Sequence, residues 1–214
     1  MSEKESKHKV VMVLSLITMG IAMISIAWCS YQANQWSGVQ TFKLRDVNND
    51  NMQADELNLK QGQFTAVDVL IFTHYSDAVF KNDTKLSKFY YDRFPPELKI
   101  AVDAWLKTDP FNNPNAPLHP FQMKEYNRTF ASQSEQFLKK MQLDLQEARN
   151  ASITSSNYIL MTVIFSMSLF ITGIIEKTGK FQLRLILLGM SIVTTSLAIG
   201  VILLFPIALN SSTG

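Results

Sequence analysis

The sequence predicts an all-α membrane protein with three transmembrane helices and a long extracytoplasmic antiparallel helical hairpin. Uncharged apolar runs cover residues 10–31, 158–175 and 185–209. Each run is near or above the ~18 residues at which an apolar segment crosses a bilayer as a helix, because hydrocarbon offers backbone groups no other partner. Residues 32–157 are mostly polar, with helical periodicity and little strand character. They are therefore expected to form a helical domain outside the bilayer.

The distribution of Lys and Arg around the apolar runs predicts the orientation of the chain. Residues 1–9 and the link 176–184 hold six of these residues in 18 positions, whereas the other flanks hold five in 45. Basic flanks are retained in the cytoplasm. We therefore expect a protein of the cell inner membrane with a cytoplasmic N-terminus and link. The domain 32–157 and the tail 210–214, which includes the C-terminus, are expected on the extracytoplasmic side.

The first run, 10–31, is predicted to be an uncleaved transmembrane helix. Its apolar stretch exceeds the 7–15 residues of a signal-peptide core, and no small-residue cleavage pair follows it cleanly. Trp28 and Tyr31 near its end, with Tyr158 in the second run, suit the outer membrane interface. An alternative is lipidation of Cys29 after a lipoprotein-like box, but Trp28 stands where that box needs a small residue. Cys29 is the one cysteine, so no internal disulfide is expected.

The outgoing part of the polar domain is predicted to be helical. Apolar residues recur at three- and four-residue steps from Met52 to Phe80, which indicates a helix running out from the first span, with Gly38 and Gly62 as possible weak points. A short helix is expected to begin at Pro95-Pro96-Glu97, because proline and an acid both suit a first helical turn. Four prolines in residues 109–120 predict a turn-rich region after it.

The returning part of the polar domain is predicted to be a second long helix. Residues 126–148 carry apolar side chains at alternating steps of about three and four, the spacing of a helix–helix seam. The segment 150–157 alone separates this pattern from the second apolar run, so the helix is expected to continue into the membrane. The outgoing and returning helices should then pack antiparallel.

Small and weakly polar residues recur along the three predicted spans. Such stripes favour helix association, because small side chains let backbones approach and hydroxyl groups can bond across the contact. The alternative is a pore in an oligomer, lined by the first span. The candidate residues for association or pore lining are Ser15, Thr18, Ala22, Ser25 and Cys29 in the first span, Thr162, Ser166 and Gly173 in the second, and Gly189, Ser196 and Gly200 in the third.

The sequence carries no strong signature of catalysis, a cofactor or a metal site. The predicted spans contain no Asp, Glu, Lys, Arg or His, which argues against pumps and ion-coupled transporters. Asp46-x-Asn48-x-Asp50 opens like a calcium loop, but the glycine and the closing glutamate that such a loop requires are missing. Nucleic acid is not an expected partner, since residues 32–157 hold 14 basic and 15 acidic residues. An enzyme is therefore not expected.

One stretch resembles a known family. The motifs are Tyr31-Gln32-x3-Trp36-Ser37-Gly38-Val39-Gln40, Val67-Asp68-Val69-x2-Phe72-Thr73, Phe89-Tyr90-x2-Arg93-Phe94-x2-Glu97-Leu98 and the proline-rich run from Ala104 to Phe121. They resemble an uncharacterised family of small bacterial three-span inner-membrane proteins with an extracytoplasmic helical domain. The resemblance implies that the aromatic, proline-rich region is a shared structural or binding feature, and it implies no activity.

The sequence therefore predicts a non-enzymatic membrane protein that acts as an accessory, scaffold or sensory subunit. The expected partners are membrane lipid and either further copies of the chain or another membrane protein. Partner contact is assigned to the aromatic residues Phe94, Trp105, Phe111 and Phe121. The alternative from another class is a homo-oligomeric ion channel lined by the first span.

Overall fold

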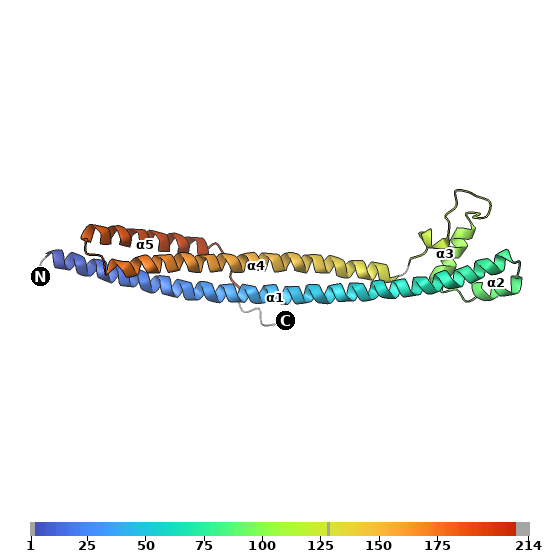
Figure 1. Ribbon diagram of the computed structural model, residues 1–214, viewed down its shortest axis with the longest axis horizontal. Coiled ribbons are helices and arrows are strands. Elements are labelled where there is room, and N and C mark those ends of the chain that lie inside the picture. Colours follow the sequence, from blue (N-terminus) through green and yellow to red (C-terminus); the bar gives the residue numbers. More distant parts are fainter. Residues whose placement is uncertain (1–2, 128, 209–214) are drawn as a thin grey trace. The chain divides into compact units, whose positions relative to one another are not determined.

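The computed structural model describes residues 3–127 and 129–208 of the 214-residue chain (Figure 1). The helices are α1 (Glu3–Phe80), α2 (Thr84–Tyr91), α3 (Pro96–Leu106), a 3-10 helix η1 (Pro120–Gln122), α4 (Thr129–Ile175) and α5 (Phe181–Ile202). The described residues contain no strand, which confirms the predicted all-α class for this part of the chain. Three helices, α1, α4 and α5, are long and apolar enough to cross a membrane.

The chain divides into two compact units. The first, here called the span unit, comprises residues 1–45 and 144–214, and the second, the aromatic unit, comprises residues 46–143. Both α1 and α4 contribute to each unit. Each unit is described below on its own.

In each unit, α1 and α4 pair antiparallel. In the span unit, Ser155 Oγ donates a 2.8 Å hydrogen bond to the Ala33 carbonyl, and Lys43 Nζ lies 2.8 Å from Asp144 Oδ1. The aromatic unit has the corresponding contacts of Ser134 Oγ with the Ala54 carbonyl and of Lys140 Nζ with the Asp50 carboxylate. In each unit, later residues of α1 contact earlier residues of α4, so the two helices run in opposite directions.

Helix α1 continues through both glycines that were expected to weaken it. Gly38 and Gly62 lie inside the helix, which is unbroken from Glu3 to Phe80. A glycine costs a helix about 1 kcal/mol relative to alanine, which packing along α4 offsets. Residues 46–50, whose spacing is like the opening of a calcium loop, also lie inside α1. Side chains two positions apart on a helix point in different directions, so these residues do not form such a loop.

A left-handed residue ends α1. Asn82 has φ 56°, its N–H donates to the Val79 carbonyl, and the Asp83 N–H donates to the Ala78 carbonyl. This pair of bonds is a Schellman motif, which satisfies carbonyl groups at the helix end. Asp83 then caps α2 by accepting a bond from the Leu86 N–H. The sequence analysis did not predict α2.

The short helix α3 begins and ends where it was predicted to. Pro96 occupies its first turn and Glu97 follows, where a carboxylate favours the positive end of the helix. Leu98 and Val102 are fully buried on its inner face. The helix ends before Asp109, which has φ 52° and starts the turns of the proline-rich segment.

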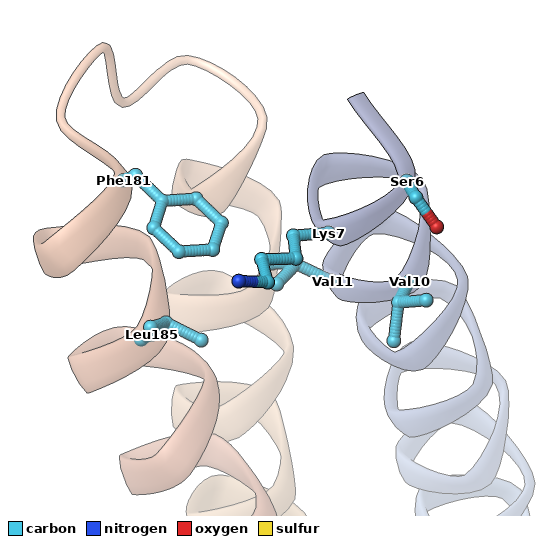
Figure 2. Close-up of a pocket in the computed structure, with 6 residues that line it drawn as sticks. All are labelled: Ser6, Lys7, Val10, Val11, Phe181 and Leu185. Atoms are coloured by element: carbon cyan, nitrogen blue, oxygen red, sulfur yellow. The ribbon is translucent and has the colours of Figure 1, made fainter. Parts of the chain in front are cut away.

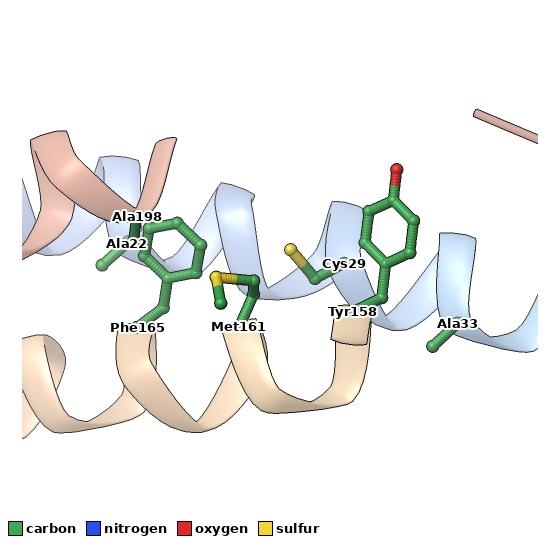
Figure 3. Close-up of a cluster of buried hydrophobic side chains, with 7 residues drawn as sticks. All are labelled: Ala22, Cys29, Ala33, Tyr158, Met161, Phe165 and Ala198. Carbon is green, nitrogen blue, oxygen red and sulfur yellow. The ribbon is translucent and has the colours of Figure 1, made fainter. Parts of the chain in front are cut away.

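The core of the span unit joins small side chains to large ones. Alanine and cysteine side chains of α1 meet aromatic and methionine side chains of α4, with one alanine from α5 (Figure 3). The cluster contains Ala22, Cys29 and Ala33 of α1, Tyr158, Met161 and Phe165 of α4, and Ala198 of α5. In a bilayer such contacts stabilise through van der Waals packing, since lipid tails are as apolar as the side chains.

Candidate functional site

The small-residue face of α1 is buried inside the span unit. Ser15, Thr18, Ala22 and Cys29 are at most 7% exposed, and Ser25 is half-buried. Ser15 and Thr18 donate their hydroxyl groups to carbonyls of α1 itself, at Met12 and Leu14. This face is therefore a packing surface toward α4 and α5 within one chain. Four of its five candidate residues are covered and unavailable to line a pore in this arrangement.

The corresponding candidates on α4 and α5 face outward. Ser166, Gly173, Gly189, Ser196 and Gly200 are exposed, and Thr162 is half-buried. A Cβ built on any of the three glycines would meet nothing within 4 Å outside its own helix. These residues therefore do not join the helices of one chain, and they leave an open surface of small side chains.

A different set of hydroxyl groups joins α4 to α5. Ser168 Oγ lies 2.9 Å from Ser191 Oγ and 2.6 Å from Thr195 Oγ1, and Thr172 Oγ1 lies 2.6 Å from Ser191 Oγ. All four side chains are at most 3% exposed. We call these four residues the hydroxyl cluster. The sequence analysis missed it, although the residues of each pair, Ser168 and Thr172 on α4 and Ser191 and Thr195 on α5, are four positions apart and so share a helical face.

Polar side chains also hold the segment that follows α5. Gln32 accepts a 2.9 Å hydrogen bond from the Ala208 N–H through Oε1 and donates to the Ala208 carbonyl through Nε2 at 3.4 Å. Trp36 Nε1 and the Tyr158 hydroxyl both donate to the Pro206 carbonyl. Phe205 packs edge-on against Tyr158. Residues 205–208 are therefore attached to both α1 and α4.

The aromatic unit has a core that contains two of the residues predicted to contact a partner. Phe94 and Trp105 are each 6% exposed, and Trp105 Nε1 donates a 2.7 Å hydrogen bond to the Pro117 carbonyl. Phe72 of α1 packs edge-on against both Trp105 and Phe121. This placement corrects the expectation of a binding surface at Phe94 and Trp105, because both rings are buried within the chain: Trp105 holds the proline-rich segment at Pro117, and Phe94 packs on Tyr75 of α1.

Part of the same aromatic unit remains exposed. Phe111 is 55% exposed, Phe80 is 71% exposed, and their ring centroids are 5.6 Å apart in an edge-on contact. Phe111 also contacts the buried Trp105 ring at 5.9 Å. Leu118, in the proline-rich segment, is 84% exposed. The exposed pair Phe80–Phe111 therefore rests on a fixed core, a property of residues that anchor protein contacts.

Carboxylates hold polar side chains in place in both units, through ion pairs with Lys43 in the span unit and a hydrogen bond from Tyr91 in the aromatic unit. Lys43 lies within 2.8 Å of the carboxylates of Asp144 and Glu147, and its hydrogen bonds with these two acids raise the pKa of the ammonium group. Tyr91 donates to Asp103, and this bond, followed by burial, raises the pKa of the Tyr91 hydroxyl to about 12. The first arrangement joins α1 to α4, and the second joins α2 to α3.

The described residues contain no group of three or more His, Cys, Asp or Glu side chains that could hold a metal ion. In the contacts described above, the hydrogen-bonded side chains join helices to one another or hold loops in place. Comparisons with protein-family models, with curated proteins and with solved structures gave no match.

Proposed function

We propose that the protein is a non-enzymatic integral membrane protein that acts as an accessory, scaffold or sensory subunit. The N-terminus and the link 176–184 lie in the cytoplasm, and the aromatic unit and the C-terminus lie on the extracytoplasmic side of the inner membrane. The positive charge at residues 1–9 and at the link supports this orientation.

The outward small-residue surface of α5 is the observation that carries the proposal. Gly189, Ser196 and Gly200 lie seven and four residues apart, so they share one helical face. All three are exposed, and the two glycines have open space around them. Without a hydrophobic drive between helices in lipid, association depends on close approach, which small residues permit. This face suits a transmembrane helix of a second copy or of another membrane protein.

The exposed pair Phe80–Phe111 supports a second contact, outside the bilayer. Large aromatic side chains that are held by a rigid core supply contact area at a low cost in conformational entropy. Phe80 comes from the end of α1, and Phe111 from the proline-rich segment. A partner that buries both rings would therefore contact two segments whose positions are fixed by the aromatic core.

The burial of the α1 face argues against a pore lined by this helix. Ala22 and Cys29 are fully buried against residues of α4 and α5. A pore built from Ser15, Thr18, Ala22 and Cys29 would first require the span unit to open. Ser25 borders one groove, with Trp28 and Ile199 among its other walls, and Ser15 borders another, on the side of Ile175 and Arg184.

Native mass spectrometry of the protein in native-lipid discs tests the proposal. The double variant G189L/G200L adds bulk to the outward face of α5, and we expect it to lose the associated copy or partner found with the wild type. The matched control is G20L, which places the same side chain on α1 at a glycine that also has open space. A wild-type protein found alone, or equal loss with G20L, would overturn the proposal.

A further inference from the structure

The seam between α1 and α4 repeats every seven residues. Its buried or half-buried positions include residues 43, 47, 50, 54, 57 and 61 of α1 and residues 134, 137, 141, 144, 148, 151 and 155 of α4, at alternating steps of three and four. The contacts of Ser155 with Ala33 and of Ser134 with Ala54 are of the same kind and lie three heptads apart on both helices. After a shift by one heptad, each seam position would again meet a seam position of the other helix.

Apolar contacts and bonds to the main chain do not distinguish such alignments. The two serines donate to carbonyl groups, which every residue carries. At the start of α1, Val11 packs with Ile175 of α4 and Leu188 of α5. Figure 2 shows a groove of about 440 Å³ beside this contact, with Phe181 and Leu185 of α5 among its walls. Contacts of this kind depend on size and apolar character, so another side chain of similar size would replace them.

The charged side chains of the seam do distinguish the alignments. Lys43 precedes Asp50 by seven residues on α1, and Lys140 precedes Glu147 by seven residues on α4. In the span unit, Lys43 Nζ lies 2.7 Å from a Glu147 carboxylate oxygen and 2.8 Å from Asp144 Oδ1. In the aromatic unit, Lys140 Nζ lies 3.0 Å from Asp50 Oδ2. Each charge therefore meets an opposite charge in the observed alignment.

A shift by one heptad would bring like charges together in either direction. One direction places Lys140 opposite Lys43, and the other places Glu147 opposite Asp50. Like charges in contact are strongly unfavourable. Asp50 is 3% exposed and Asp144 is 8% exposed. A shift would also remove the cations from these buried carboxylates, which is costly because the carboxylates have given up water.

We propose that Lys43, Asp50, Lys140, Asp144 and Glu147, here called the register charges, select the observed alignment of α1 and α4. Buried ion pairs often stabilise a fold no more than apolar side chains of similar size would, but they can specify one register. The apolar part of the seam holds the two helices together, and the register charges determine which residues meet. This role depends neither on the proposed membrane placement nor on association with a partner.

Disulfide cross-linking of the full-length protein measures the alignment. All variants carry C29A, which removes the native thiol. S134C is combined in turn with A54C, V47C or Q61C. Ser134 contacts Ala54 in the observed alignment, whereas residues 47 and 61 each lie one heptad from residue 54 and would meet residue 134 after a shift. Oxidation followed by mass spectrometry of the peptides gives the yield of each intramolecular disulfide. With the native charges, we expect the A54C disulfide and little of the other two.

Charge reversal then tests the register charges. K140E/D144K/E147K brings like charges together in the observed alignment, whereas either shifted alignment pairs opposite charges. We expect the yield of the A54C disulfide to fall about ten-fold and a disulfide with V47C or Q61C to appear. Adding K43E/D50K restores opposite charges in the observed alignment. The yield of the A54C disulfide should then return to its value with the native charges.

The matched control is E135K/K139E, which exchanges the members of an exposed ion pair within α4 and should leave all three yields unchanged. Four outcomes would overturn the inference. They are a persistent A54C disulfide after reversal of the α4 charges, absence of any shifted disulfide in that variant, no recovery with K43E/D50K, and an equal loss in the control.

Discussion

The hydroxyl cluster shows how single side chains decide the packing of two apolar helices. Hydrophobic burial does not distinguish one face of α5 from another when the surroundings are hydrocarbon. Hydrogen bonds between side chains do distinguish the faces of α5, because an unpaired hydroxyl group in an apolar environment is costly. Ser168 contacts two of the three other members through its Oγ atom, at Ser191 and Thr195. Ser191 likewise contacts two, Ser168 and Thr172, so these two serines connect the cluster.

Replacing Ser168 with alanine should destabilise the packing of α4 on α5. The variant removes two side-chain contacts and leaves the Thr195 hydroxyl without that partner, so we expect a loss of about 1–2 kcal/mol in the free energy of unfolding. Unfolding in mixed micelles, followed by circular dichroism, measures the change. S166A is the matched control, because Ser166 is exposed and bonds only within α4, to the Thr162 carbonyl. Equal losses in the two variants would contradict the role of the cluster.

The hydroxyl group of Tyr91 predicts a pH dependence in the aromatic unit. Its pKa is raised from 10 to about 12 because it donates to Asp103 and is partly buried. The folded state therefore holds this proton more tightly than the unfolded state, and the contribution is complete below pH 10 and lost as the pH rises through 12. We expect Y91F and D103N each to flatten the fall in unfolding free energy between pH 10 and 12. If the unfolding free energy of Y91F fell between pH 10 and 12 as steeply as that of the wild type, this assignment would be contradicted.

Helix ends, more than helix interiors, determine how the elements connect. Helix α1 continues through two glycines without interruption but ends at Phe80, shortly before Asn82, whose backbone is left-handed. Asparagine tolerates this conformation better than most residues, and glycine adopts it without a Cβ penalty. The carboxylate of Asp83 then caps the next helix. Two adjacent residues thus end one helix and begin another.

Substitutions at Asn82 should change stability in opposite directions. N82G should stabilise the aromatic unit by roughly 0.5 kcal/mol, whereas N82A should destabilise it by about 1 kcal/mol, because alanine pays the left-handed penalty in full. Denaturant unfolding of the three proteins measures both changes. Values of the same sign for the two variants would show that the Asn82 side chain, and not the backbone conformation, determines the stability of this turn.

The sequence was most informative where one periodic pattern fills a long helix. Continuous apolar runs and three- and four-residue steps predicted the long helices, and proline with glutamate predicted α3. Helix α2 was missed because it has eight residues, none of them buried, and hence no strong apolar stripe. The hydroxyl cluster was missed because periodicity identifies a face but not its partner. Phe94 and Trp105 were assigned to a surface because a one-dimensional aromatic pattern does not distinguish a core from a binding site.

At the scale of the whole molecule, the two units have different chemistry. The span unit is held by apolar packing, four hydroxyl groups and the bonds of Gln32, whereas the aromatic unit uses edge-on ring contacts and ion pairs. Positive charge is concentrated at residues 1–9 and 176–184. This asymmetry is the basis for the proposed orientation in the membrane.

Single cysteines should report that orientation directly. Asn112 is exposed in the aromatic unit and Lys177 is exposed in the link, whereas the native Cys29 is buried and should react slowly. With an impermeant maleimide on intact cells, N112C should be labelled at once and K177C only after the membrane is permeabilised. The reverse pattern would place the N-terminus outside.

The attachment of residues 205–208 to α1 and α4 has a consequence for biosynthesis. Gln32 and Trp36 emerge from the ribosome long before their partners at Ala208 and Pro206. At 5–20 residues per second, the delay is on the order of ten seconds. During that interval the Gln32 amide lacks its Ala208 partner, and the small-residue face of α1 has no partner from its own chain until α4 has been made. The first span therefore needs lipid, water or an insertion factor to cover this face until α4 and α5 have been made.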